Sequence, residues 1–229
     1  MVLQGRAGAG KSTLLSVAAG LRCPDAGAVW LADRNIATLQ HSSLPFVRRN
    51  IGYLPQETLL LPHETVLENL MLVLGVRGDS VTAAEGKARE ALALVGDATW
   101  EERLTGFLSA GQQRLVALAR ALAGAPPLVV LDEPGAGLGG DDLALVRQSI
   151  AWARRQGSAV LCATADPGFA EAMVDEGARQ VHVEDGRIAG APAIGLVPDP
   201  EDDSFPEDGF DAEEIARLTD RLSAGKEPT

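Results

Sequence analysis

The sequence has no long apolar run. No stretch approaches the roughly 20 apolar residues that a helix needs to span a bilayer, so we expect no transmembrane segment. The start at Met1 also lacks the apolar centre and cleavage site of a signal peptide. The remaining composition, 46% hydrophobic and 23% charged, is typical of a soluble globular domain, so we expect a cytoplasmic protein.

Cysteine is scarce. Cys23 and Cys162 are far apart in apolar contexts, and their spacing is not that of a metal site. We therefore expect two buried, free thiols in a reducing compartment.

Clustered positive charge is missing too. The net charge is −12 at pH 7, and no basic stripe interrupts the acidic surface. Because neutralisation of phosphates drives association with nucleic acid, we expect no nucleic-acid partner. Residues 196–229 contain eleven acidic against three basic residues and are rich in proline. We expect this segment to be a largely disordered acidic tail after a domain spanning residues 1–195.

A glycine-rich segment near the start carries chemistry. It matches the P-loop pattern over Gly5, Arg6, Ala7, Gly8, Ala9, Gly10, Lys11, Ser12 and Thr13. Glycines let successive amides curl around phosphate oxygens, and the following helix adds its positive end. We expect Lys11 to reach the β- and γ-phosphates of ATP and the Ser12 hydroxyl to be a ligand of Mg²⁺. The pattern indicates a nucleotide but not which reaction follows.

An acidic pair complements this loop. The apolar run 128–131 predicts a buried strand that delivers Asp132 at its carboxyl end, where open α/β sheets bind ligands. We expect Asp132 to hold the magnesium and Glu133 to polarise an attacking water as general base.

The order of apolar patterns predicts an α/β fold. Short unbroken apolar runs at 2–3, 128–131 and 159–163 are typical of parallel strands covered on both faces. A short strand at 28–32, a crossover helix at 143–153 and a closing hairpin at 181–188 complete the core. Between about 60 and 122, three helical patterns form an insertion. The expected fold is a P-loop NTPase (RecA-like) parallel sheet with an inserted helical subdomain.

Two further segments narrow the class. Residues 108–114, Leu-Ser-Ala-Gly-Gln-Gln-Arg, resemble the signature motif of ABC ATP-binding proteins, with Ala110 in place of a glycine. Gln56, after Ile51-Gly-Tyr-Leu-Pro, resembles the Q-loop glutamine. All four motifs follow in the ABC order, so residues 1 to about 190 resemble an ABC transporter ATP-binding domain.

The resemblance implies a dimer. Ser109, Gly111 and Gln112 would face an ATP held by the P-loop of a second copy, so ATP would close a head-to-tail homodimer. Gln56 would touch the magnesium and the attacking water and so act in catalysis beside Glu133. The insertion would dock a transmembrane, permease-like partner.

A subfamily is also indicated. Residues 42–52 and 59–70 resemble the FtsE cell-division ATPases, whose membrane partner is FtsX. The resemblance implies a peripheral location on the inner face of the cell membrane. Lipoprotein-extracting and peptide-exporting relatives share much of this pattern.

Three features depart from the family. Where ABC proteins have a Thr-His pair, this chain has Thr164-Ala165. The loop aspartate that crosses to the partner falls at Gly139, with Asp141 and Asp142 slightly late. The chain begins four residues before Gly5, so the family's preceding strands and their adenine-stacking aromatic are absent from it. A truncated family member without this aromatic should bind adenine more weakly by about 1–3 kcal/mol, whereas a chain that starts further upstream would form an ordinary ABC domain.

Together these features predict a slow ATPase subunit of an ABC membrane complex. One missing transition-state hydrogen bond can cost roughly 10²–10³ in rate. The alternative is a nucleotide-responsive regulatory module with little hydrolysis. A third interpretation, an ABC factor acting on nucleic acid or ribosomes, is disfavoured by the acidic composition and the single ABC domain.

Overall fold

The computed structural model describes residues 1–31, 34–36, 44–96 and 98–189. The expectations for the acidic tail, residues 196–229, fall outside this described part.

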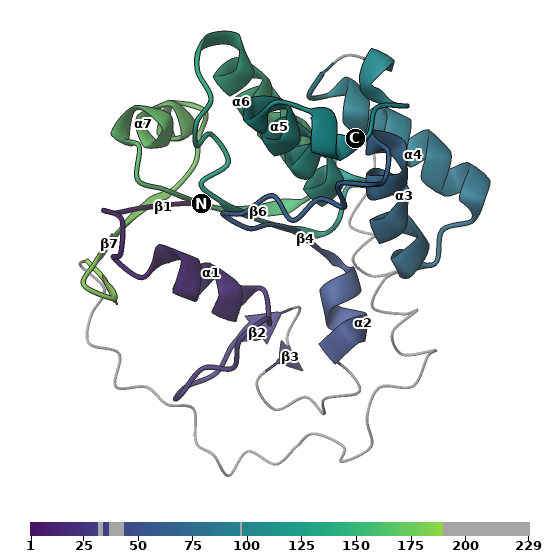
Figure 1. Ribbon diagram of the computed structural model, residues 1–229. Coiled ribbons are helices and arrows are strands. Elements are labelled where there is room, and N and C mark those ends of the chain that lie inside the picture. The colour runs from purple at the N-terminus through teal and green to yellow at the C-terminus, as the bar shows by residue number, and fades with distance from the viewer. Residues whose placement is uncertain (32–33, 37–43, 97, 190–229) are drawn as a thin grey trace, which may run out of the picture.

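A six-stranded sheet forms the centre of the molecule (Figure 1). Its strands are β1 (Val2–Gln4), β4 (Ile51–Leu54), β5 (Leu128–Asp132), β6 (Ala159–Thr164), β7 (Gln180–Glu184) and β8 (Arg187–Ile188). The order across the sheet is β4-β5-β6-β1-β7-β8, and all neighbours are parallel except β7 and β8. The expected α/β fold with a parallel sheet and a closing hairpin is confirmed.

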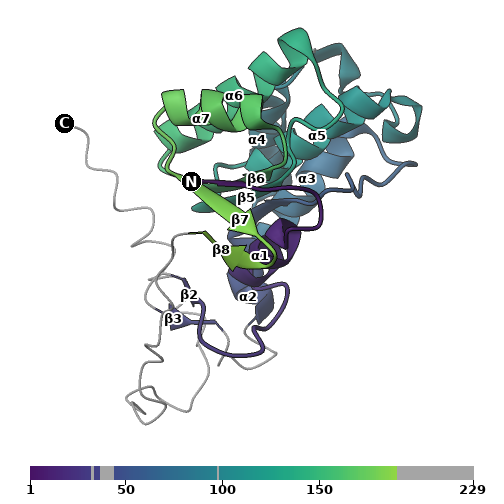
Figure 2. The same ribbon diagram turned by 90° about the vertical axis from the view of Figure 1, so that its left-hand side faces the viewer.

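Helices cover both faces of this sheet (Figures 1 and 2). Helix α1 (Lys11–Ala18) lies on one face, and α5 (Ala110–Leu122), α6 (Gly140–Arg155) and α7 (Pro167–Asp175) lie on the other. Successive strand residues point to opposite faces, so Val130 packs on the α1 side and Leu131 on the α5 side. This two-sided burial explains the unbroken apolar runs of the strands.

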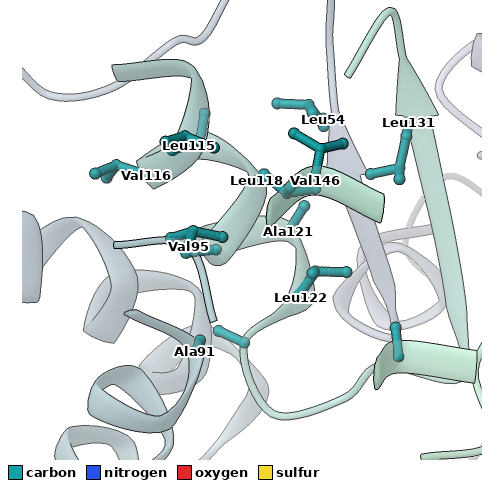
Figure 3. Close-up of a cluster of buried hydrophobic side chains, with 14 of the residues drawn as sticks. Leu54, Ala91, Val95, Leu115, Val116, Leu118, Ala121, Leu122, Leu131 and Val146 are labelled. Carbon is teal, nitrogen blue, oxygen red and sulfur yellow. The ribbon is translucent and has the colours of Figure 1, made fainter. Parts of the chain in front are cut away.

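The insertion is helical, as its periodicity predicts. It contains α3 (Val66–Arg77), α4 (Val81–Ala93), two short 3-10 turns (Ala98–Trp100 and Thr105–Phe107) and α5. Ala91 and Val95 pack into the same apolar cluster as Leu118 and Leu122 of α5 and Leu54 of β4 (Figure 3). Helix α5 therefore joins the insertion to the sheet.

The sequence did not predict several elements. Helix α2 (Leu44–Arg49) leads into β4, and the strand expected at 28–32 is only β2 (Trp30–Leu31), which pairs with β3 (Arg34–Asn35). Helix α7 was also missed, although Asp166 caps it and Pro167 occupies its first turn.

The cysteine expectation is half wrong. Cys162 is buried in β6, but Cys23 is exposed in the loop after α1. That loop runs over the surface, where even Leu21 is 44% exposed, so an apolar neighbourhood in sequence did not mean burial. Among the described residues, none of the helices is both long and apolar enough to cross a membrane.

Candidate nucleotide site

The carboxyl ends of four parallel strands bring the expected site residues to one edge of the sheet. Register pairs Leu54 of β4 with Leu131 of β5, and Asp132 of β5 with Ala163 of β6. Gln56 follows β4, the acidic pair ends β5, Ala165 follows β6, and the P-loop follows β1. This edge is where open α/β sheets bind ligands.

The P-loop glycines are required for two different reasons. Gly8 and Gly10 have left-handed backbones, with φ of 81° and 96°, which favours glycine. Gly5 lies against β7, where a Cβ would come within 2.3 Å of the Val183 carbonyl oxygen. The turn between β7 and β8 also supports the loop, because the Gly186 N–H donates to the Ala9 carbonyl at 2.9 Å.

Lys11 places its charge at the centre of this edge. Its side chain is buried, and Nζ donates to the carbonyls of Gly5 and Arg6 at 2.8 and 3.2 Å. The same ammonium lies 3.3 Å from Oε1 of Glu133. The cation of the loop and the second acid after β5 therefore meet at one point.

Asp132 has the properties of a cation ligand. It is only 2% exposed, and its Oδ1 is buried without a hydrogen-bond partner. Burial raises the pKa of its carboxyl above the ordinary 3.8, and a hydrogen bond from the Ser12 hydroxyl partly offsets this rise. A carboxylate oxygen with no partner beside a serine hydroxyl fits the hard oxygen ligands that Mg²⁺ prefers.

Glu133 is held in an unusual backbone conformation. Its φ of 51° is left-handed, which a residue with a side chain adopts rarely and at a cost of order 1–3 kcal/mol. Its N–H donates to the Ala163 carbonyl at 2.9 Å, and its carbonyl accepts from Nη2 of Arg114 at 2.6 Å. These bonds hold the strained residue at the end of β5.

Arg114 is a site residue to which the sequence analysis gave no role. It lies in the second turn of α5, is 4% exposed, and donates to main-chain carbonyls at the ends of both β4 and β5. One of those carbonyls belongs to Gln56, whose side chain is exposed at the same edge.

The signature residues begin helix α5. The Ser109 side chain caps the helix by accepting from the Gln112 N–H at 3.2 Å, and the Gln112 side chain accepts from the Ser109 N–H at 3.0 Å. Gln112 therefore serves the cap, and its contact with a nucleotide stays a prediction. A Cβ on Gly111 would lie 3.3 Å from Leu138, so the first turn packs closely on the loop after β5.

Two of the three positions at which the sequence is expected to depart from the family pattern lie in the described part of the structure. Ala165 is exposed directly after β6, and Asp166 caps α7 by accepting from the Gly168 N–H at 2.9 Å. Asp141 and Asp142 lie in the first turn of α6, where the helix dipole favours acids, and not in the preceding loop.

Comparison with known proteins indicates the family of the chain. The family model described as ABC transporter matches residues 1–136. The chain is 39% identical to the lipoprotein-releasing system ATP-binding protein LolD of Chromohalobacter salexigens, over 72% of this chain and 71% of LolD. It is 40% identical to the Fe(3+) ions import ATP-binding protein FbpC of Streptomyces coelicolor, over 81% of this chain and 51% of FbpC. The chain thus spans about half the length of the FbpC proteins it matches.

A solved structure is similar as well. The dimeric structure of MJ0796, a bacterial ABC transporter cassette, superposes with a TM-score of 0.76 at 29% identity, covering 82% of each chain. The family model alone matches more than half of the residues. The chain therefore belongs to the ABC transporter family, as one of its ATP-binding ATPase cassettes.

Proposed function

We propose that the chain binds Mg-ATP at this edge of the sheet and hydrolyses it slowly, as the ATP-binding subunit of an ABC membrane complex. The convergence of Lys11, Asp132 and Glu133 supports this most strongly, because one loop cation and two acids meet where a γ-phosphate would arrive. In this proposal residues 1–195 form the cassette, with residues 60–122 as its helical subdomain.

Each residue then has a stated role. The P-loop amides and Lys11 would bind the phosphates, while Asp132, Ser12 and Gln56 would hold Mg²⁺, which supplies neutralisation of phosphate charge. Glu133 would accept a proton from the attacking water, because its carboxylate lies 3.3 Å from the Lys11 ammonium that would bind the phosphates. Binding of phosphate to Lys11 would compete with the Lys11–Glu133 ion pair and so free the carboxylate.

A second copy would complete the site. The similar MJ0796 cassette is dimeric, and a post-hydrolysis dimer of it binds ADP and Pi. We propose that Ser109 and the Gly111 amide of one subunit bind the γ-phosphate held by the other. The Ser109 hydroxyl accepts within its own cap and can still donate its hydrogen to a phosphate oxygen.

An exposed apolar surface on the insertion suits the membrane partner. Leu59, Leu61, Leu104 and Phe107 are exposed, Phe107 by 86%. The two segments that carry them are adjacent, because Thr65 pairs with Leu104 and the Gly106 N–H donates to the Pro62 carbonyl at 3.0 Å. Such an apolar surface is typical of a protein interface. We propose an FtsE-like cassette that docks an FtsX-like permease subunit here, on the inner face of the membrane.

Slow turnover follows from Ala165. A methyl group cannot donate the hydrogen bond that the family's histidine gives to the γ-phosphate, and the next residue, Asp166, accepts from the Gly168 N–H in the cap of α7. The second candidate function, a nucleotide-responsive module with little hydrolysis, is favoured by the same residue together with Gly139.

The test separates the two candidates. Purified protein is mixed with Mg-ATP, and phosphate release and molar mass are measured together, with Lys11→Ala as the control that cannot bind phosphate. A slow, Lys11-dependent release with an ATP-dependent dimer is the expected result. A dimer without measurable release would support the regulatory module. If neither an ATP-dependent dimer nor phosphate release is observed, both candidate functions are rejected.

A further inference from the structure

Arg114 joins two strand ends that are far apart in sequence. Nη1 donates to the carbonyls of Pro55 and Gln56 at 2.8 and 2.9 Å, both just after β4. Nη2 donates to the carbonyls of Asp132 and Glu133, at the end of β5. Each terminal nitrogen of the planar guanidinium therefore serves one strand, a geometry that a lysine ammonium cannot reproduce.

The bonds of Arg114 go to the main chain and not to carboxylates. Nearby Asp132 and Glu133 help keep the guanidinium charged, although burial lowers the pKa of Arg114. Arg114 therefore does not occupy the two carboxylates. Asp132 Oδ1 has no hydrogen-bond partner, and the Glu133 carboxylate pairs with Lys11. Arg114 thus fixes where the two acidic residues and Gln56 sit without neutralising them.

Arg114 also connects these two strand ends to the signature residues, because it lies on helix α5. Ser109 caps the same helix five residues earlier, about 7.5 Å along its axis. From Arg114 to Ala119 every residue of α5 is buried, so the helix that Ser109 caps is packed against the core from the Arg114 position onwards.

We propose that Arg114 is a positioning residue that couples the two ATP sites of the dimer. Arg114 hydrogen-bonds to the backbones of Glu133 and Gln56, which act on the ATP bound by the same subunit. It belongs to helix α5, whose Ser109 contacts the ATP bound by the other subunit. This inference rests on the proposed roles of Glu133 and Ser109. It adds that occupation of one site sets the geometry of the base in the other.

Arg120 provides a matched control on the same helix. It also donates to two carbonyls of the segment after β4, those of Thr58 and Leu59, both at 2.8 Å. Its bonds do not extend to β5, according to the contacts of the described residues. Arg120 is half-buried whereas Arg114 is buried, so comparing Arg114→Lys with Arg120→Lys separates loss of the β5 connection from loss of an α5 arginine that binds only the segment after β4.

The experiment measures steady-state phosphate release against ATP concentration for the full chain and both variants. Rates are normalised to the sites titrated with a fluorescent ATP analogue, and thermal unfolding is followed in parallel. For Arg114→Lys we expect KM to change less than about 3-fold and kcat to fall by about 10²-fold, the effect of a misplacement near 1 Å. We also expect its Hill coefficient to drop towards 1. Arg120→Lys should keep kcat and the Hill coefficient of the parent.

Three results would overturn the proposal. The first is an equal loss of kcat in both variants, and the second is an unchanged Hill coefficient in Arg114→Lys. The third is failure of Arg114→Lys to fold while Arg120→Lys folds, because Arg114 would then be a structural residue only. A wrong assignment of Glu133 as the base would give a different result, because Glu133→Gln, measured alongside, would then hydrolyse ATP as fast as the parent.

Discussion

The ends of two neighbouring strands, β5 and β6, differ sharply. Strand β5 ends at Asp132 and is followed by Glu133, and the two residues are held by contacts with Ser12, Lys11 and Arg114. Strand β6 ends in Thr164, and the next residue is the exposed Ala165. The difference teaches that, in the proposed site, β5 supplies the groups for magnesium binding and base catalysis, whereas the described end of β6 supplies no side-chain donor at Ala165. We therefore expect firm phosphate binding with slow chemistry.

Removing the base at the end of β5 should have the largest effect. Glu133→Gln keeps the shape of the side chain but removes its proton acceptor, so we expect kcat to fall by about 10²–10⁴-fold. ATP-bound dimers should accumulate, because the neutral side chain no longer opposes phosphate at Lys11. Single-turnover phosphate release and molar mass measure the two effects. Glu171→Gln, an exposed residue of α7, is the control, and an active Glu133→Gln would show that β5 does not carry the base.

A substitution at Ser109, in the signature motif, should have an intermediate effect. It tests whether the signature motif of a second copy completes the site formed at the end of β5. Ser109→Ala should lower ATP-dependent dimerisation by about 10- to 100-fold for each of the two sites, the value of one hydrogen bond to a charged group. It should also cost about 1 kcal/mol of stability as a lost helix cap. Thr65→Ala is the matched control, since Thr65 forms the same type of capping box on α3. Equal dimerisation of the two variants would argue against a phosphate contact by Ser109.

The smallest effect concerns the buried charge of Asp132. Its pKa is raised in the folded chain, so without ligand the folded state binds the proton more tightly than the unfolded state. Protonation of Asp132 should therefore increase the free energy of unfolding as pH falls from 7 through the raised pKa towards 3.8. Asp132→Asn has no titrating carboxyl at this position, so its stability relative to the parent should decline as pH falls from 7 towards 4. Urea unfolding at both values checks this, and a relative stability that rises on acidification would refute it.

The sequence predicted the parts of this site that local pattern determines. The P-loop follows from the glycine spacing of Gly5 to Thr13, and Asp132 follows from the apolar run before it. Strand β4 was not identified, although its register beside β5 places Gln56. The insertion was identified because the repeat of Ala84, Ala88 and Ala91 matches one buried helix face.

Other features depend on tertiary contacts and could not be predicted. The left-handed φ of Glu133 depends on bonds to Ala163 and Arg114, which come from different elements. Arg114 stands beside Gln56 only because α5 packs on β4, 58 positions away in the chain. The exposure of Cys23 likewise reflects the path of a surface loop.

The bare end of β6 offers the most direct test of the comparison. Ala165→His places a donor where the family has one, beside a β5 end that otherwise has the residues for hydrolysis. Steady-state phosphate release by the variant should exceed that of the parent by about 10-fold or more, since one such hydrogen bond can contribute 10²–10³. A parent that is already fast, with no gain from the histidine, would contradict the claim that Ala165 limits turnover.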